Sequence, residues 1–274
     1  MFELVLFQKA FLACLIIGFT NGYASAFVLM NRSPLKLSAL SHSLLPGICL
    51  ATFLVGLTVV SAFIGAVVTA IAIGTLSILF ARYSKLSQDT MLSILYTGAF
   101  ALGIMAIDRM GHASELEHWL LGNILGITHL DLTMSFIIGV LAIGLMTLFM
   151  RPILITLFEP DVAETLGIPV RVVQYVGFTL LILVLVTTLQ AVGCILSVGL
   201  IVTPGATIRL FTNRPRVLFI GSGGLGAIGA ATGLTIAYHL DFPAEASIVM
   251  TLTSFFLIAW IIHISLTLYK KKLT

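Results

Sequence analysis

The chain has 274 residues, of which 59% are hydrophobic and only 9% are charged, and its mean hydropathy is +1.15 with a formal net charge of +3. Soluble domains carry about 25% charged residues, so this composition excludes a water-soluble protein and predicts an integral membrane protein. The three cysteines, Cys14, Cys49 and Cys194, lie in apolar stretches, and their spacing fits neither a disulfide framework nor a zinc site.

The gaps between charged residues predict the membrane helices, because a spanning helix needs about 20 apolar residues. The long gap 37–81 predicts two spans, broken near Gly56–Ser61. The gap 172–208 predicts two more, broken near Gln190–Gly193, although one span with a kinked or re-entrant piece is an alternative. We therefore expect an all-α bundle of about nine spans, with eight or ten as alternatives, in a single domain, residues 1–274. The charge-free gaps in chain order are 10–31, 37–81, 90–107, 132–150, 172–208, 217–240 and 246–269.

The distribution of lysine and arginine predicts the orientation of the bundle. With nine spans, most basic residues fall on the side of the C-terminal Lys270–Lys272, and acidic residues dominate the opposite loops. The opening stretch MFELVLFQKAF lacks the basic start and cleavage site of a signal peptide, so we interpret it as part of the first span. We expect the N-terminus outside and the C-terminus in the cytoplasm.

A polar patch interrupts the apolar run after residue 37. Ser38, Ser41 and His42 share one helix face, and an ionisable residue inside a span usually faces a cavity or the bundle interior. The helix-breaking pair Pro46–Gly47 follows, and a second pair, Pro204–Gly205, lies in a later span. Paired interruptions are typical of transport pathways, so these pairs are candidate hinges. The alternative is a structural histidine bonded to a neighbouring helix and two packing kinks.

The segment Gly221–Gly233 contains the spacing G-x-G-x-x-G, which is also found in dinucleotide-binding folds. Here it begins a charge-free stretch of membrane length. Small residues at every fourth position allow close helix approach, so we expect helix packing and no nucleotide site.

The stretch LFEPDVAETLGIPVR, Leu157–Arg171, predicts a short cytoplasmic helix between two spans. Pro160 suits the first turn, Gly167 suits the position after the last turn, and Pro169 ends the helix. A capped helix of this kind can dock another protein, and an ordinary connecting loop is the alternative. Its remaining side chains are acidic near the N-terminal end and apolar along one stripe: Glu159, Asp161 and Glu164; Val162, Ala163 and Leu166.

Five stretches spread over nearly the whole chain carry a family resemblance: LSALSHSLLPGICLA, HWLLGNILGIT, FEPDVAETLGIPV, LQAVGCILSVGLIVTPGATIRLFTNR and YHLDFPAEASIVM. In this order they resemble the metal-ion permease family of ATP-binding-cassette (ABC) importers for zinc, manganese or iron. The resemblance implies a homodimeric or heterodimeric channel core that binds two cytoplasmic ATPase subunits. It also implies an extracytoplasmic metal-binding protein that delivers the ion, and a location in the bacterial inner membrane. Our hypothesis for the mechanism is alternating access driven by ATP.

The resemblance also implies roles for single residues. The segment from Glu159 to Gly167, including Asp161, Ala163 and Glu164, resembles the coupling helix that seats in the ATPase, and His42 resembles the pathway histidine. The family usually has an aspartate four residues before that histidine, where this chain has Ser38, a poorer and uncharged metal ligand. The identity of the metal stays open, and a partner permease that supplies the carboxylate is one possibility.

The chain has no phosphate-binding G-x-x-x-x-G-K-[ST] motif, so ATP hydrolysis is expected in a partner subunit. We expect no catalytic residue, no resident cofactor and no nucleic-acid partner. The alternative function is an intramembrane metal-dependent enzyme. Such an enzyme favours H-E-x-x-H or clustered histidines, but only His42 of the six histidines lies deep in a span.

Overall fold

The computed structural model describes residues 2–31, 39–41, 43–56, 58–110, 122 and 124–273, and every regular element in them is a helix. Among these residues, seven helices are long and apolar enough to cross a membrane, namely α1, α4, α5, α7, α10, α11 and α12. The chain is thus an all-α, multi-pass membrane protein, as predicted. The described elements are α1 (Phe2–Met30), α3 (Leu45–Val55), α4 (Val59–Tyr83), α5 (Gln88–Met110), η1 (Ile124–Gly126), α7 (His129–Leu148), α8 (Met150–Phe158), α9 (Pro160–Thr165), α10 (Val170–Arg209), α11 (Pro215–Leu240) and α12 (Ala244–Leu273).

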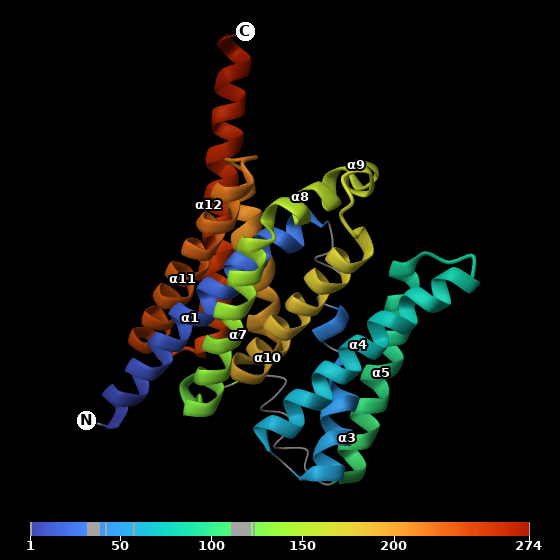
Figure 1. Cartoon of the computed structure of the whole chain (residues 1–274). Helices are drawn as coiled ribbons and strands as arrows, with labels where there is room; N and C mark the ends of the chain where they lie inside the picture. Colours follow the sequence, from blue (N-terminus) through green and yellow to red (C-terminus); the bar gives the residue numbers. More distant parts are fainter. Residues whose placement is uncertain are drawn as a thin grey trace.

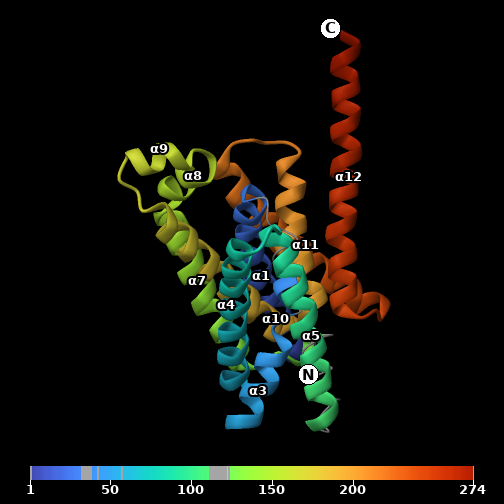
Figure 2. The same cartoon turned by 90° about the vertical axis from the view of Figure 1, so that its right-hand side faces the viewer.

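The two ends of the bundle differ in what they carry (Figures 1 and 2). The short helices α8 and α9 lie at the same end as the C-terminus, and the N-terminus lies at the opposite end. Helices α3, α4 and α5 form a group on one side of the bundle (Figure 1). Helices α1 and α10 are the most buried of the seven long helices, and they supply much of the apolar core.

Helix α11 packs against α1 through direct backbone contact at small residues. A Cβ atom added to Gly18 of α1 would lie 2.6 Å from the carbonyl oxygen of Gly226, and one added to Gly226 would collide with the carbonyl oxygen of Gly18. Gly22 and Ser222 make an equally close pair one turn along. Without a hydrophobic force between helices in lipid, such close packing is a main source of association. The packing role predicted for segment 221–233 is confirmed.

Helix α10 folds back on itself at Gly193. The backbone there has φ 79°, a left-handed value, within a 40-residue element. Asn21 donates a hydrogen bond to Thr188 Oγ1 at 2.7 Å, and Ser25 donates one to the carbonyl of Val202 at 3.1 Å. Asn21 and Ser25 are one turn apart, about 6 Å, whereas positions 188 and 202 would lie about 21 Å apart on a straight helix. The two halves of α10 therefore run back along α1, and the break predicted near Gln190–Gly193 is confirmed.

The break predicted near Gly56–Ser61 is also present. Helix α3 ends at Val55, and Gly56 follows with φ 96°. The hydroxyl of Thr58 accepts a hydrogen bond from the N–H of Ser61, whose hydroxyl in turn accepts one from the N–H of Thr58. This capping box satisfies donors at the start of α4, so a new helix begins there.

The two proline-glycine pairs do not break their helices as the sequence suggested. Pro46 lies in the first turn of α3, where its missing N–H costs nothing. Gly47 packs against α4, because an added Cβ would collide with Thr69 and the carbonyl of Gly65. In α10 the only non-helical backbone angles are at Gly193, and the chain stays helical through Pro204.

A serine of α1 repairs the hydrogen bonding around Pro204. The Ser25 hydroxyl accepts a bond from the N–H of Gly205 at 2.9 Å and donates one to the carbonyl of Val202 at 3.1 Å. Proline removes one donor and displaces the neighbouring bonds of a helix, and lipid offers no replacement partner. Ser25 is fully buried, so its hydroxyl bridges the interrupted ladder of α10.

The contact between α1 and α11 gives a matched pair of glycine substitutions. We expect Gly226→Ala to lower the free energy of unfolding by about 1–3 kcal/mol, because the new Cβ forces two backbones apart. Gly224→Ala in the same helix meets nothing within 4 Å and should leave stability unchanged or slightly raised. Thermal unfolding of the purified protein in detergent measures both, and equal midpoints for the two variants would contradict this packing.

The Ser25 bridge predicts a second stability difference. Ser25→Ala should destabilise the protein by about 1–3 kcal/mol, because a buried N–H and carbonyl lose their partner. The control is Ser254→Ala, whose exposed hydroxyl bonds only to its own helix at Met250. If both variants unfold at the wild-type temperature, the hydroxyl does not support α10.

Candidate functional site

The predicted metal residues Ser38 and His42 lie outside the described residues, but their flanking segments are described. Ser41 and Ser43, on either side of His42, are 2% and 0% exposed. The hydroxyl of Ser43 donates to the carbonyl of Leu40 at 2.8 Å, so it is already satisfied within its own segment. The described residues on either side of position 42 are therefore buried within the bundle.

This segment lies beside the turn of α10. The thiol of Cys194, the residue after Gly193, donates to the hydroxyl of Ser41 at 3.5 Å. On the other side of the turn, the Gln190 side-chain amide donates to the carbonyl of Val59 at the start of α4 at 2.7 Å. The apolar cluster around them joins α3, α4 and α10: Leu44, Ile48, Cys49, Ala62, Ala66, Ala70, Ile182, Val186, Leu189 and Cys194.

The chemistry available here is limited to single polar groups. Among the described residues, no group of three or more His, Cys, Asp or Glu side chains has the arrangement of a metal site. The described part instead places the Ser41 hydroxyl, the Cys194 thiol and the Gln190 amide close to the backbone turn at Gly193. Sequence reasoning placed the turn but missed the contact between Ser41 and Cys194, because residues 153 positions apart leave no local pattern.

The short helix predicted within Leu157–Arg171 is present as α9, with Pro160 in its first turn. It ends in a Schellman motif, in which the N–H of Gly167 donates to the carbonyl of Glu164 at 3.0 Å and the N–H of Ile168 donates to that of Ala163 at 2.9 Å. Gly167 has φ 74°, which glycine adopts without strain. Pro169 then caps α10, so α9 and α10 are joined by a short, rigid corner.

The side chains of α9 divide into an inner and an outer set. Ala163 is 0% exposed, so it packs α9 onto its own chain, and in this conformation its side chain cannot contact a partner as the sequence suggested. Val162 and Leu166 are 42% and 63% exposed and point away from the core. Three exposed carboxylates accompany them on the outer side: Glu159, Asp161 and Glu164.

At the opposite end of the bundle, polar groups tie loops to helices. The carboxylate of Glu245 at the start of α12 accepts a hydrogen bond from the N–H of Ile124 in η1 at 2.7 Å. Asp131 completes a capping box with Thr128 at the start of α7. Lys9 Nζ and His129 Nε2 lie 2.8 Å apart and link α1 to α7. These groups therefore hold together the end of the bundle where the N-terminus lies.

Comparisons with known proteins agree with this architecture. Residues 3–263 match the ABC 3 transport family. The chain is 36% identical to the manganese transport system membrane protein MntC of Halalkalibacterium halodurans over 92% of this chain and 86% of that protein. It is 30% identical to a Haemophilus influenzae protein named "Probable iron transport system membrane protein", over 92% of each chain.

A solved structure shows the same fold. The structure of PsaBC from Streptococcus pneumoniae in complex with Fab contains a chain that is 34% identical, with a TM-score of 0.84 over 92% of this chain and 90% of that one. None of these relatives is named as an enzyme, and the matched family is one of transport proteins. The chain belongs to the ABC 3 transport family and is a multi-pass membrane permease of an ABC transporter.

Proposed function

We propose that this chain is the permease subunit of an ABC importer for a divalent transition metal, with manganese as the first candidate cargo. The observation that carries this proposal is the 36% identity over 92% of the chain to a membrane protein of a manganese transport system. Iron is the second candidate cargo, because the Haemophilus influenzae relative is named for iron transport. The metal is cargo, so the chain holds no resident cofactor, and ATP is bound by a partner subunit.

The proposed membrane topology has nine spans. The seven long helices account for seven. The fold-back at Gly193 makes α10 two spans, and the segment that ends in α3 adds the ninth. An odd number is supported by the termini, which lie at opposite ends of the bundle (Figures 1 and 2). Arginines at the α9 end favour that end as the cytoplasmic one, which puts the N-terminus outside: Arg82, Arg151, Arg209, Arg214 and Arg216.

The outer face of α9 is the proposed docking surface for the cytoplasmic ATPase. Val162 and Leu166 expose apolar surface at the end of the bundle that faces the cytoplasm in this orientation. The flanking carboxylates of Glu159, Asp161 and Glu164 add charge that a basic cleft of a partner can recognise. At the opposite end, the loops held by Glu245 and Asp131 form the surface proposed to receive an extracytoplasmic metal-binding protein. A second permease subunit, identical or related, completes the channel.

A continuous chain of contacts connects the proposed docking surface with the proposed metal path. Helix α10 begins directly after the α9 corner at Pro169 and runs to the turn at Gly193. Cys194 then contacts Ser41, next to His42. In this proposal the ATPase displaces α9, and the first half of α10 moves with it as a rigid body toward the segment around position 42. In the proposed alternating-access cycle, His42 and Ser38 line the path, and the Pro46–Gly47 and Pro204–Gly205 segments are the proposed hinges.

The cargo and the role of His42 can be tested together by uptake. Cells that lack this gene and carry a plasmid copy should take up radioactive manganese at limiting concentration, and cells without the plasmid should not. His42→Ala should lower manganese uptake by about tenfold or more, because the imidazole is the strongest metal ligand on its helix face. Ser38→Ala should change uptake by less than about threefold, since a hydroxyl is a weak ligand.

The control for this experiment is His263→Ala, which removes a histidine in the second half of α12. Its uptake should equal that of the wild type. Wild-type uptake by His42→Ala would remove this residue from the path, and uptake of zinc in preference to manganese and iron would overturn the proposed cargo.

The docking surface predicts a separate loss. Leu166→Asp should abolish co-purification of the ATPase and reduce uptake to the level of the gene deletion, because it places a charge in an apolar contact. Leu86→Asp, an exposed leucine in the α4–α5 loop, is the matched control and should keep both. The amount of chain in the membrane, measured by immunoblot, separates lost docking from lost folding. Retention of the ATPase by Leu166→Asp would contradict the assignment of α9.

A further inference from the structure

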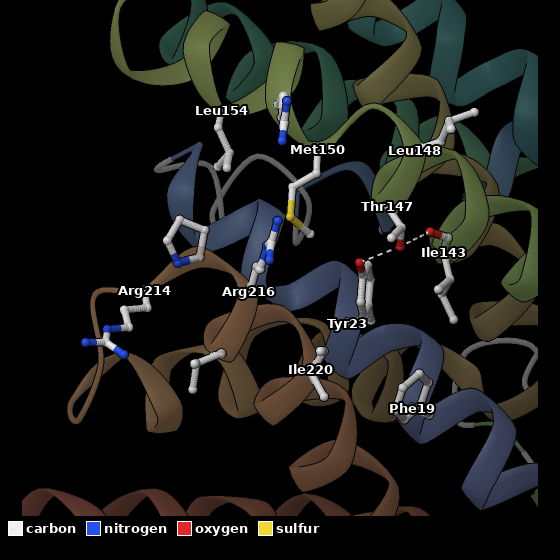
Figure 3. A pocket seen from close by; sticks show the side chains of 13 residues that line it. Phe19, Tyr23, Ile143, Thr147, Leu148, Met150, Leu154, Arg214, Arg216 and Ile220 are labelled. Carbon is white, nitrogen blue, oxygen red and sulfur yellow. Dashed lines mark hydrogen bonds between the residues drawn. The ribbon is translucent and has the colours of Figure 1, made fainter.

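A groove opens between α1, the α7–α8 corner and the start of α11 (Figure 3). Its volume is about 980 Å³, and it lies at the α9 end of the bundle. The side chains of Arg214 and Arg216 come from the start of α11, and Met150 and Leu154 come from α8 (Figure 3). Neither the metal path nor the proposed docking surface uses this groove.

The rim of the groove is strongly basic. Its lining includes Arg151, Arg214 and Arg216 and no acidic side chain. Within the part of the chain that the structure describes, no carboxylate forms an ion pair with any of the three guanidinium groups. Arg214 is also the N-cap residue of the 26-residue helix α11, whose positive dipole end adds to the charge. The rim therefore favours an anion with several oxygen atoms.

The wall below the arginines offers no free polar group. The hydroxyls of Tyr23 and Thr147 bond to each other at 2.7 Å, and Thr147 also donates to the carbonyl of Ile143 at 2.6 Å (Figure 3). The rest of this wall is apolar, with Phe19 and Ile220 among its side chains. An anion at the rim thus has a hydrophobic surface directly beneath it.

The apolar wall continues toward the middle of the bundle. A second hollow of about 400 Å³ shares Phe19 and Ile143 with the first and adds Leu15, Phe136 and Val140. From Tyr23 to Leu15 along α1 the surface extends about 12 Å, and from Thr147 to Phe136 along α7 about 16 Å. This length suits most of an acyl chain, and a small soluble anion would leave it uncovered.

We propose that the groove is a binding site for an anionic phospholipid, with its phosphate on Arg151, Arg214 and Arg216 and an acyl chain along Phe19, Ile143 and Val140. Basic pockets between membrane helices on the cytoplasmic side are suited to such headgroups. In the membrane orientation proposed above, the groove lies in the cytoplasmic leaflet, and this assignment rests on that proposed orientation. Because α8 forms one wall of the groove and leads into α9, a bound lipid braces the corner that carries the docking helix.

The test is lipid retention by the complete permease, purified with its ATPase and exposed to equal amounts of phosphatidylcholine and phosphatidylglycerol. Native mass spectrometry of the complex should show phosphatidylglycerol bound in preference. The double variant Arg214→Gln and Arg216→Gln should retain about tenfold less phosphatidylglycerol, with phosphatidylcholine unchanged. Arg82→Gln, an exposed arginine at the end of α4, is the matched control and should bind like the wild type.

A second variant tests the apolar half of the site. Ile143 lines both the groove and the second hollow, so Ile143→Trp should fill the space between them and lower retention of long-chain phosphatidylglycerol. Inorganic phosphate added to the wild-type complex should not displace the lipid. Equal retention of the two lipids by the wild type would overturn the proposal. Displacement of phosphatidylglycerol by inorganic phosphate alone would also overturn it. An arginine variant that retains phosphatidylglycerol but loses the ATPase would overturn it too, because the arginines would then contact the ATPase. Manganese uptake is scored separately, so failure of this site leaves the proposed transport function standing.

Discussion

The structure depends on one constraint, that a backbone inside a membrane must find its hydrogen-bond partners within the protein. The backbone hydrogen-bond ladder of α10 is interrupted at two places, by the reversal at Gly193 and by Pro204. Helix α1 supplies the compensation, because Asn21 bonds to Thr188 on one half of α10 and Ser25 bridges the ladder on the other. A reversal in the interior is tolerated because helices surround it and polar side chains from α1 take part in it.

The same two helices explain why glycine is concentrated where it is. For Ser25 and Asn21 to reach α10, α1 must sit deep in the bundle, with α11 close against its other face. Gly18 and Gly226 allow that closeness because neither has a side chain to separate the backbones. The glycine-rich face of α11 is thus a consequence of burying α1, and it needs no nucleotide to account for it.

The arrangement also separates the tasks of the two ends. At the end with the N-terminus, Glu245, Asp131 and Lys9 are engaged with neighbouring loops and helices. At the α9 end, Val162 and Leu166 stay exposed, and the arginines around the groove have no acidic neighbour in its lining. Between the ends, the first half of α10 connects the α9 corner to the turn beside Ser41. A permease moved by a separate ATPase needs such a connection between docking surface and path.

The sequence by itself determined the membrane class and the helical fold, and it predicted the breaks near Gly56–Ser61 and Gln190–Gly193 and a capped helix within Leu157–Arg171. These features follow from local rules, since charge spacing, glycine conformation and capping act within a few residues of the chain. The motif stretches around His42 and α9 also identified the family. Only the tertiary structure decided that Pro46 lies in the first turn of α3, that Ala163 is buried while Leu166 is exposed, and that Ser25 repairs α10. It alone brought Ser41 against Cys194 and assembled the arginine-rimmed groove from three separate parts of the chain. Contacts of this kind depend on which faces of distant helices meet, and apolar sequences in lipid, where nearly every face is hydrophobic, leave that choice to packing.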